Sequence, residues 1–279
     1  RDDWAAAHNY IHAINSAISS LETLPLSSRL LRETHAELMQ GVRGEHKQPG
    51  EFRVSQNWIG VSLKNAVFVP PHHERVPDLM SDLEKFLHTE QHFVHPLLRI
   101  AIAHYQFETI HPFLDGNGRL GRLMISLYLA SEGLLHKPAL YLSDYFERNK
   151  TAYVDHLMAV RQGNHLRNWL VFFLYGVEET ARASADVFRG VIDLKQRIER
   201  DVLPRFSARR QDNAHILMRQ LYARPVIDVK WVTTMIDASV NTASALIDDM
   251  VRLGVLVEIT GQRRNRLFVF SDYLNLFRS

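Results

Sequence analysis

Apolar residues recur every three or four positions through most of the chain, which is the spacing of amphipathic helices. Prolines, serines and glycines at the ends of these runs mark where helices start and stop. The predicted helices cover about residues 4–21, 27–39, 77–89, 96–109, 118–133, 149–162, 165–183, 185–202, 213–223, 229–237 and 241–253. The pattern therefore predicts a mainly α fold.

Two stretches depart from the helical pattern. Residues 52–69 hold β-branched and aromatic residues on either side of a polar turn, which predicts a small β-hairpin. Residues 255–259 and 267–270 predict a second hairpin, and its tip, 261–266, is basic. Because three short helices precede this second hairpin, residues 204–279 resemble a winged helix-turn-helix domain.

The character of the sequence changes around Pro204, where a polar stretch containing arginines follows a helical run. We interpret this stretch as a linker, so the expected domains are residues 1–203 and 204–279. A chain of 279 residues that is 46% hydrophobic is long enough to bury two cores.

Composition excludes several classes of protein. The formal net charge is +2, so the chain as a whole has no electrostatic attraction for nucleic acid or membrane. There is no cysteine, which excludes disulfides and thiolate metal sites and is compatible with the cytoplasm, where we expect the protein. The longest nearly apolar run, Trp169–Val177, is too short to span a bilayer, so no membrane partner is expected.

The chemistry of the chain is concentrated in residues 111–122, His-Pro-Phe-Leu-Asp-Gly-Asn-Gly-Arg-Leu-Gly-Arg. Gly116 and Gly118 can adopt backbone angles closed to other residues, so the N–H groups of residues 116–118 can converge on one anion. A helix starting at about Gly118 adds the unpaired N–H groups and partial positive charge of its N-terminus. We expect phosphate to bind there.

Four side chains around this turn complete the candidate site. Arg119 and Arg122 lie on neighbouring positions of one helix face, and their guanidinium groups match phosphate oxygens. Asp115 would repel phosphate unless a hard cation such as Mg²⁺ lies between them. His111, with an ordinary pKa of ~6.5, can accept a proton at neutral pH and is the candidate general base.

The whole string resembles, position by position, the HPFx(D/E)GNGRxxR signature of the Fic family (filamentation induced by cyclic AMP). The resemblance covers about residues 1–200 and implies a Fic-type helical bundle. It also implies a protein AMP transferase that uses ATP and Mg²⁺. In that family the histidine deprotonates a Ser, Thr or Tyr hydroxyl of a target protein, the oxygen attacks the α-phosphorus of ATP, and pyrophosphate leaves.

The resemblance assigns roles to the residues of the motif. His111 is the base and Asp115 the Mg²⁺ ligand. Backbone amides and the Asn117 side chain cradle the phosphates, and the two arginines steady the β- and γ-phosphates. The nucleotide-binding residues of the motif are then Gly116, Asn117, Gly118, Arg119, Gly121 and Arg122. The related Doc branch, which transfers a phosphate, carries Lys where this chain has Gly118, and this difference favours AMP transfer.

Other parts of the chain also resemble the family. Phe113 resembles the buried anchor of the motif loop, while Tyr153 and Leu157 lie in a stretch similar to the part that closes over the adenine. The hairpin at about 52–69 resembles the flap that docks the backbone of the target protein. The docking residues of this flap are then Val67, Phe68 and Val69.

Alternative functions stay open at this point. Similar motifs elsewhere in the family support transfer of UMP or phosphocholine. A DNA-binding regulator, in which the winged helix is the main functional part, is favoured by the arginines of the hairpin tip and opposed by Asp248 and Asp249 on the third helix. A protein-interaction module, including one that forms a homodimer, is the remaining use of residues 204–279.

A regulatory element of the family has no match in this sequence. Many Fic proteins are held inactive by a helix bearing (S/T)xxxE(G/N), whose glutamate pairs with the second motif arginine, here Arg122. Ser143 and Glu147 have this spacing, but Arg148 follows where Gly or Asn is expected, and the stretch lies beyond the motif. The resemblance places such a helix upstream of Arg1, so we expect this chain to be active without restraint compared with a longer form.

Overall fold

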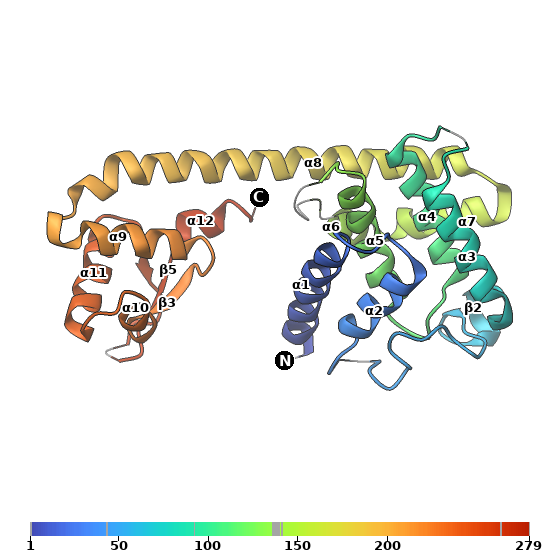
Figure 1. Cartoon of the computed structure of the whole chain (residues 1–279), viewed down its shortest axis with the longest axis horizontal. Coiled ribbons are helices and arrows are strands. Elements are labelled where there is room, and N and C mark those ends of the chain that lie inside the picture. The colour runs from blue at the N-terminus through green and yellow to red at the C-terminus, as the bar shows by residue number, and fades with distance from the viewer. Residues whose placement is uncertain are drawn as a thin grey trace. The chain divides into compact units, whose positions relative to one another are not determined.

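The computed structural model describes residues 2–42, 44–91, 93–135, 140, 142–262 and 264–278. The chain forms two compact units, Arg1–Ala181 and Arg182–Ser279 (Figure 1), each with a hydrophobic core of its own. The boundary falls inside one long helix, α8 (Leu166–Arg197). It therefore lies earlier in the chain than the boundary predicted at 203/204 from the change in composition.

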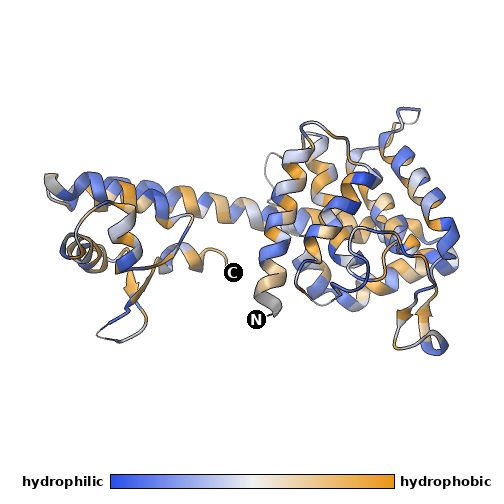
Figure 2. Ribbon diagram, turned by 60° about the horizontal axis from the view of Figure 1, so that its bottom comes forward, coloured by the Kyte–Doolittle hydropathy of each residue, from blue (hydrophilic) through white to orange (hydrophobic). Residues whose placement is uncertain are grey.

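The first unit is a helical bundle, and the prediction of a mainly α fold is confirmed. Its helices are α1 (Asp2–Ser20), α2 (Ser28–Leu38), α3 (Val76–His88), α4 (Pro96–Ile110), α5 (Asn117–Ser131), α6 (Leu142–Arg148), α7 (Lys150–Gly163) and the first part of α8. Helices α4 and α5 pack against each other, with α3 beside α4 and with α1 and α2 against α5. The helices carry hydrophobic and hydrophilic residues side by side (Figure 2), as amphipathic packing requires. The α4–α5 pair carries the motif.

Trp169 fixes the start of α8 to the centre of this bundle. Its side chain is fully buried, and its indole Nε1 donates a hydrogen bond of 2.9 Å to the backbone oxygen of Ala101 in α4. Buried Trp needs such a partner for its N–H group. The contact places one face of this apolar run against the bundle: Trp169, Phe172 and Phe173 are buried, while Val171 and Tyr175 stay exposed.

The predicted hairpin exists but is shorter than residues 52–69. Its strands, β1 (Ile59–Gly60) and β2 (Ala66–Phe68), are antiparallel, and Ile59 lies opposite Phe68. Residues 52–58 do not pair as a strand, because Arg53 and Asn57 are buried and turn inward to bind the motif loop. The sequence pattern of this segment reflects burial as well as strand formation.

Helix α8 corrects the prediction of two helices over 165–183 and 185–202. It is one helix of 32 residues that runs on into a π-helical turn, Ile198–Val202, and a 3₁₀ turn, Leu203–Arg205. Nothing around Ser184 breaks the helix, because its neighbours are alanines, the best helix formers. Among the described residues, no helix is both long and apolar enough to cross a membrane.

The second unit combines the end of α8 and the helices that follow it with a small sheet. After α8 come α9 (Ala208–Leu221), β3 (Val226–Asp228), α10 (Val229–Met235), α11 (Val240–Arg252), β4 (Val257–Glu258), β5 (Leu267–Val269) and the short α12 (Ser271–Asn275). The sheet is antiparallel with β5 in the centre, in the order β3-β5-β4. The sequence pattern predicted the second hairpin and missed β3, which is only three residues long.

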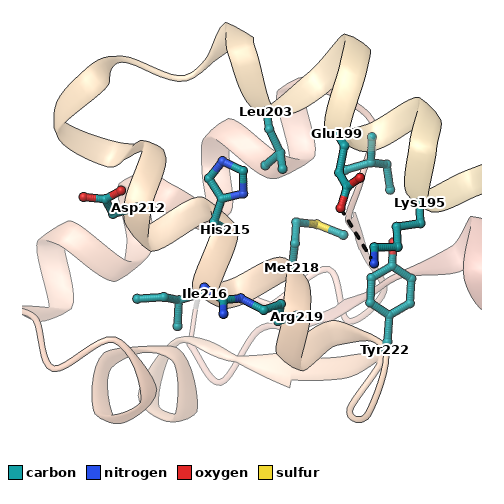
Figure 3. Close-up of a pocket in the computed structure, with 10 residues that line it drawn as sticks. Lys195, Glu199, Leu203, Asp212, His215, Ile216, Met218, Arg219 and Tyr222 are labelled. Carbon is teal, nitrogen blue, oxygen red and sulfur yellow. Dashed lines mark ion pairs between the residues drawn. The ribbon is translucent and has the colours of Figure 1, made fainter.

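A hollow of about 510 Å³ lies in the second unit between the end of α8 and α9 (Figure 3). Its floor is apolar, with Leu203, Ile216 and Met218, and its rim carries the ion pair of Lys195 and Glu199, with Nζ and Oε1 3.9 Å apart. The rim offers charges of both signs, so the lining favours no single class of ligand.

Candidate active site

The motif loop joins α4 to α5 through two left-handed turns of the backbone. His111, with φ +51°, caps the end of α4, and Gly116, with φ +77°, caps the start of α5. Helix α5 begins at Asn117, within one residue of the predicted start. The unpaired N–H groups at the start of α5 therefore lie at the end of the loop, as an anion site requires.

The side chain of Asn117 closes the loop. It is buried, its Oδ1 accepts from the backbone N–H of Phe113 at 2.9 Å, and its Nδ2 donates to the backbone oxygen of Phe113 at 2.7 Å. The expectation that this side chain cradles phosphate stays a prediction, since both of its polar groups already bond to the loop backbone in the free protein. The backbone N–H of Asn117 is the group that it can offer to an anion.

Phe113 is the buried anchor that the sequence predicted. It is fully buried, and its ring stacks on the ring of His35 in α2, with the centroids 3.9 Å apart. His35 Nε2 donates to the backbone oxygen of Asp115 at 2.9 Å, while its Nδ1 accepts from the backbone N–H of Gly50 at 2.8 Å. Burial lowers the pKa of His35, so the ring is neutral and its tautomer is set by these two bonds.

Arg53 ties the other side of the loop to the base of the flap. Its guanidinium is buried and donates to backbone oxygens at the end of α4, from Nε to His111 at 3.0 Å and from Nη2 to Ile110 at 3.3 Å. The same group donates to the backbone oxygens of Ser55 and Pro71 on either side of the flap. One side chain thus fixes the flap and the motif loop relative to each other.

Asp115 is held as a carboxylate beside the start of α5. Its Oδ2 lies 3.1 Å from Lys47 Nζ, and its Oδ1 accepts from the backbone N–H of Gly116 at 2.7 Å. Burial raises the pKa of Asp115, but the Lys47 and Gly116 hydrogen bonds and the charges of Lys47 and Arg119 outweigh it and leave the pKa lowered. Mg²⁺ commonly takes one or two protein carboxylates together with phosphate oxygens and waters, so this half-buried carboxylate fits the ion.

The two arginines of the motif lie on the first turns of α5. Arg119 Nη2 lies 3.0 Å from the sulfur of Met39. Arg122 passes close to Gly118, where an added Cβ would lie 3.2 Å from its Nη1. Gly121 points the other way, towards α4, and an added Cβ there would lie 2.5 Å from Glu108 Oε1. Gly121 therefore makes room for a buried carboxylate, and the predicted nucleotide contact at this residue does not follow from its position.

His111 is uncharged at neutral pH. Its side chain is 18% exposed, and its Nδ1 is buried without a hydrogen-bond partner in the protein. Burial lowers the pKa of His111 to about 4, and the charges of Arg161 and Arg53 act in the same direction. The backbone of Glu108 and the charge of Asp115 act in the opposite direction and raise the pKa. A neutral imidazole is the form that can accept a proton.

Tyr153 and Leu157, predicted to contact adenine, lie on α7. The hydroxyl of Tyr153 donates to Nε2 of the fully buried His104 at 2.9 Å, and Leu157 is 5% exposed and belongs to the core. Nδ1 of His104 in turn donates to the backbone oxygen of Gly121 at 3.0 Å. Through His104, Tyr153 therefore supports α5 at Gly121, and its predicted contact with adenine stays a prediction.

The predicted docking residues of the flap differ in exposure. Val67 is 56% exposed and Val69 is 49% exposed. The ring of Phe68, in contrast, lies under the guanidinium of Arg161 in α7, 3.9 Å from Arg161 Cζ to the ring centroid. The two valines face solvent and Phe68 attaches the flap to the bundle.

Several residues of the site lie outside the motif and were not predicted. Lys47, Arg53 and His35 come from far earlier in the chain and reach the loop only through the fold. Glu108 is different, because it precedes His111 by three positions on a helix, and that spacing places two side chains on one face. This spacing is a signal that the sequence did contain.

Fold and site together define a helical domain in which a loop places the first N–H groups of α5 next to a neutral histidine. Residues 25–129 match the Fic/DOC family. The part of the chain that carries the motif loop is therefore similar to that family.

Curated relatives bear a common name. Over 180 residues the chain is 32% identical to "Protein adenylyltransferase Fic" of Aedes aegypti, which covers 63% of this chain and 32% of that protein. Over 128 residues it is 34% identical to the protein of the same name in Drosophila grimshawi, which covers 46% of this chain and 24% of that protein. The chain spans about a third or less of the length of these relatives.

Solved structures share the fold. A Fic family protein from Desulfovibrio desulfuricans matches with a TM-score of 0.53 at 20% sequence identity and covers 94% of this chain and 74% of that one. Fic-1 from C. elegans matches with a TM-score of 0.50 at 23% identity and covers 66% of this chain and 52% of that one. At these identities the likeness is one of fold.

The clamp by Asn117 gives a first prediction. Replacing Asn117 with Ala leaves the N–H of Phe113 buried without a partner, while the carbonyl of Phe113 keeps its bond from Asn57 Nδ2. The free energy of unfolding should therefore fall by about 1–3 kcal/mol, and nucleotide affinity should fall with it. Denaturation followed by circular dichroism and calorimetric titration with ATP measure the two effects. Asn149→Ala, which removes one half-buried hydrogen bond to Tyr145, is the control and should cost no more than about 1 kcal/mol. Equal losses in the two variants would show that the loop is closed by other contacts.

Proposed function

We propose that this chain transfers AMP from ATP to a hydroxyl side chain, of Ser, Thr or Tyr, on a target protein. The observation that carries the proposal is the neutral His111 beside an anion-binding helix start. His111 takes the hydroxyl proton, the oxygen forms a bond to the α-phosphorus, and the bond from that phosphorus to the leaving pyrophosphate breaks. The names of the relatives support AMP as the transferred group.

The residues around His111 have complementary parts in this reaction. The N–H groups at the start of α5 and the guanidinium groups of Arg119 and Arg122 bind the phosphates. Asp115 would hold Mg²⁺, which would supply positive charge to the phosphate groups when it is bound. Lys47, whose Nζ lies 3.1 Å from Asp115 Oδ2, adds a further positive charge beside this carboxylate.

The transferred group is tested directly. The protein is incubated with Mg²⁺ and each nucleoside triphosphate in turn, and separately with CDP-choline, and adducts on the protein itself and on lysate proteins are weighed by intact mass spectrometry. An AMP adduct formed from ATP alone is the expected result. An adduct of UMP or phosphocholine would replace the AMP assignment and keep the same site.

His111 is the residue that separates catalysis from binding. His111→Ala should reduce AMP transfer by ~10²–10⁴-fold while the Kd for ATP stays nearly unchanged, because a base acts on the attacking hydroxyl and not on the nucleotide. Initial rates of AMP incorporation and calorimetry give the two quantities. His12→Ala, at an exposed histidine of α1, is the control and should behave as the parent. Transfer by His111→Ala at the parental rate would exclude His111 as the base.

The flap is proposed to hold the target protein by strand addition. Its strands are two and three residues long, it is fixed to the motif loop through Arg53, and it presents the exposed Val67 and Val69. An extended segment of the target that pairs with the flap would bring its hydroxyl close to His111. Phe68 is less suitable for testing this, since it also packs on Arg161.

Val69→Asp provides the test of the flap. A carboxylate at a surface that a target covers costs about 1–3 kcal/mol of desolvation, so kcat/KM for a protein target should fall by roughly 10-fold or more with little change in the Kd for ATP. Val61→Asp at the end of the same hairpin, where the side chain is 94% exposed, is the matched control. The flap assignment is wrong if the two variants modify the target equally well, or if ATP affinity falls in step with Val69→Asp.

A second candidate function, DNA binding by residues 204–279, gains support from the ion pairs of α11. Asp249 pairs with Arg210 and Arg252, and Asp248 Oδ1 lies 3.8 Å from Arg266 Nη1, so the two carboxylates that oppose DNA binding in the sequence are each offset. A groove between α10, α11 and the β4–β5 tip is lined by Asp228, by the apolar Val229, Val240 and Leu267, and by basic and small polar residues. These include Lys230, Thr233, Thr234, Ser244, Arg264, Asn265 and Arg266. We infer that a winged helix-turn-helix domain would contact DNA through this groove.

Salt dependence decides this second candidate. In fluorescence anisotropy with labelled duplex DNA, the slope of log K against log salt should become shallower by about 1 for Lys230→Ala, because each phosphate contact releases counterions. Arg189→Ala removes one charge from α8 outside the groove and should leave the slope unchanged. No retention of DNA at low salt would leave protein interaction or dimerisation as the role of this unit, which light scattering would then measure.

A further inference from the structure

Glu108 lies one helical turn before His111, at the end of α4, and is 6% exposed. Its Oε2 is 4.0 Å from Nδ1 of His111. No role was assigned to this carboxylate by the motif, which begins at His111. A carboxylate this deep in a domain needs an explanation, because burying charge is unfavourable unless a partner compensates it.

The two side chains leave complementary atoms unsatisfied. Among the described residues, His111 Nδ1 and Glu108 Oε1 belong to the few buried side-chain atoms that have no hydrogen-bond partner. One is a ring nitrogen that can carry a hydrogen and the other is a carboxylate oxygen that can accept it. The nearer carboxylate oxygen to Nδ1 is the other one, Oε2, at 4.0 Å, so the ring and the carboxylate are not hydrogen-bonded in the free protein. Such contacts at catalytic sites often tighten only when substrate is bound.

The surroundings keep the carboxylate in this place. Gly121 of α5 leaves the space that Oε1 occupies, since a Cβ there would lie 2.5 Å from it. Arg161 of α7 holds the backbone of the same turn, with Nη2 donating to the Glu108 backbone oxygen at 3.0 Å and Nε donating to Thr109 Oγ1 at 3.1 Å. Three helices thus build the pocket around one side chain.

We propose that Glu108 is a positioning residue whose carboxylate accepts a hydrogen bond from Nδ1–H of His111 and so leaves Nε2 of the ring as the proton acceptor. The same negative charge favours the imidazolium that forms once His111 has taken the hydroxyl proton. The inference rests on the proposed AMP transfer for its kinetic consequence, while the tautomer itself is a property of the free protein.

The proposal has a consequence for pH. Burial raises the pKa of Glu108 to about 7, against the charges of Arg122 and Arg161, and the Tyr153 hydroxyl is the other titratable group of α7 that the carboxylate faces. Below that pH the carboxyl gains a proton and no longer accepts from Nδ1–H, while His111, with its pKa near about 4, is still neutral. Transfer should therefore decline as the pH falls through about 7, and the group responsible is Glu108 rather than His111.

The experiment has a structural arm that needs no activity. The protein is labelled with nitrogen-15 at histidine, and the ring nitrogens of His111 are assigned by comparison with His111→Ala. Long-range proton–nitrogen spectra of the free protein at pH above 8 should show the tautomer with hydrogen on Nδ1, and Glu108→Gln should lose or mix that state. A wild-type ring with hydrogen on Nε2 would overturn the proposal.

The kinetic arm uses the same variant. Glu108→Gln should lower kcat for AMP transfer by roughly 10²-fold at unchanged KM for ATP and should flatten the decline near neutral pH. Glu33→Gln, the same change at an exposed carboxylate of α2, should leave both unaltered. A wild-type pH profile in Glu108→Gln would show that the Glu108 backbone oxygen alone orients His111 and would refute the role of the carboxylate. A wild-type protein that transfers no group at all would refute the proposed function, and the spectra would still decide the tautomer.

Discussion

The contact on which the site depends most is that of the buried Arg53 guanidinium with the last carbonyls of α4. Helix ends leave carbonyl oxygens without intrahelical partners and carry partial negative charge, and a buried cation satisfies both conditions at once. Burial lowers the pKa of Arg53, although a guanidinium stays charged at any pH at which the protein folds. Because the same group also binds the backbone at Ser55 and Pro71, loss of the contact would release the flap and the left-handed turn at His111 together.

The site is built so that its histidine is neutral and its anion-binding groups are positive. Arg53 and Arg161 both lower the pKa of His111, and Arg122 and Arg161 act in the same direction on that of Glu108. The arrangement suits a reaction that brings a highly charged nucleotide to a base. Burial is the main cause of the low pKa of His111, and the two arginines that add to it, Arg53 and Arg161, donate to backbone oxygens at the end of α4. The groups that hold the loop in place therefore also keep the base neutral.

A feature of this structure can be predicted from the sequence when the residues that determine it lie close together along the chain. The glycines around Asn117 define a turn followed by a helix, and that start was located within one residue because the determinants are local. The bonds of the Asn117 side chain were not predicted, because an amide beside an anion site can bind either phosphate or backbone. Its bonds to the backbone depend on where the fold places Phe113. Lys47 and His35 reach the loop across many residues, and no spacing rule signals such contacts.

Gly121 and Glu108 illustrate a constraint between two positions that the motif does not express. The Oε1 atom of Glu108 lies 2.5 Å from where a Cβ at position 121 would be, so a methyl group there would displace the carboxylate from its present place. The two residues should therefore be inherited as a pair across related sequences. A relative with Ala or Ser at the second position would be expected to have lost the carboxylate as well, and with it a way of orienting the histidine from within α4.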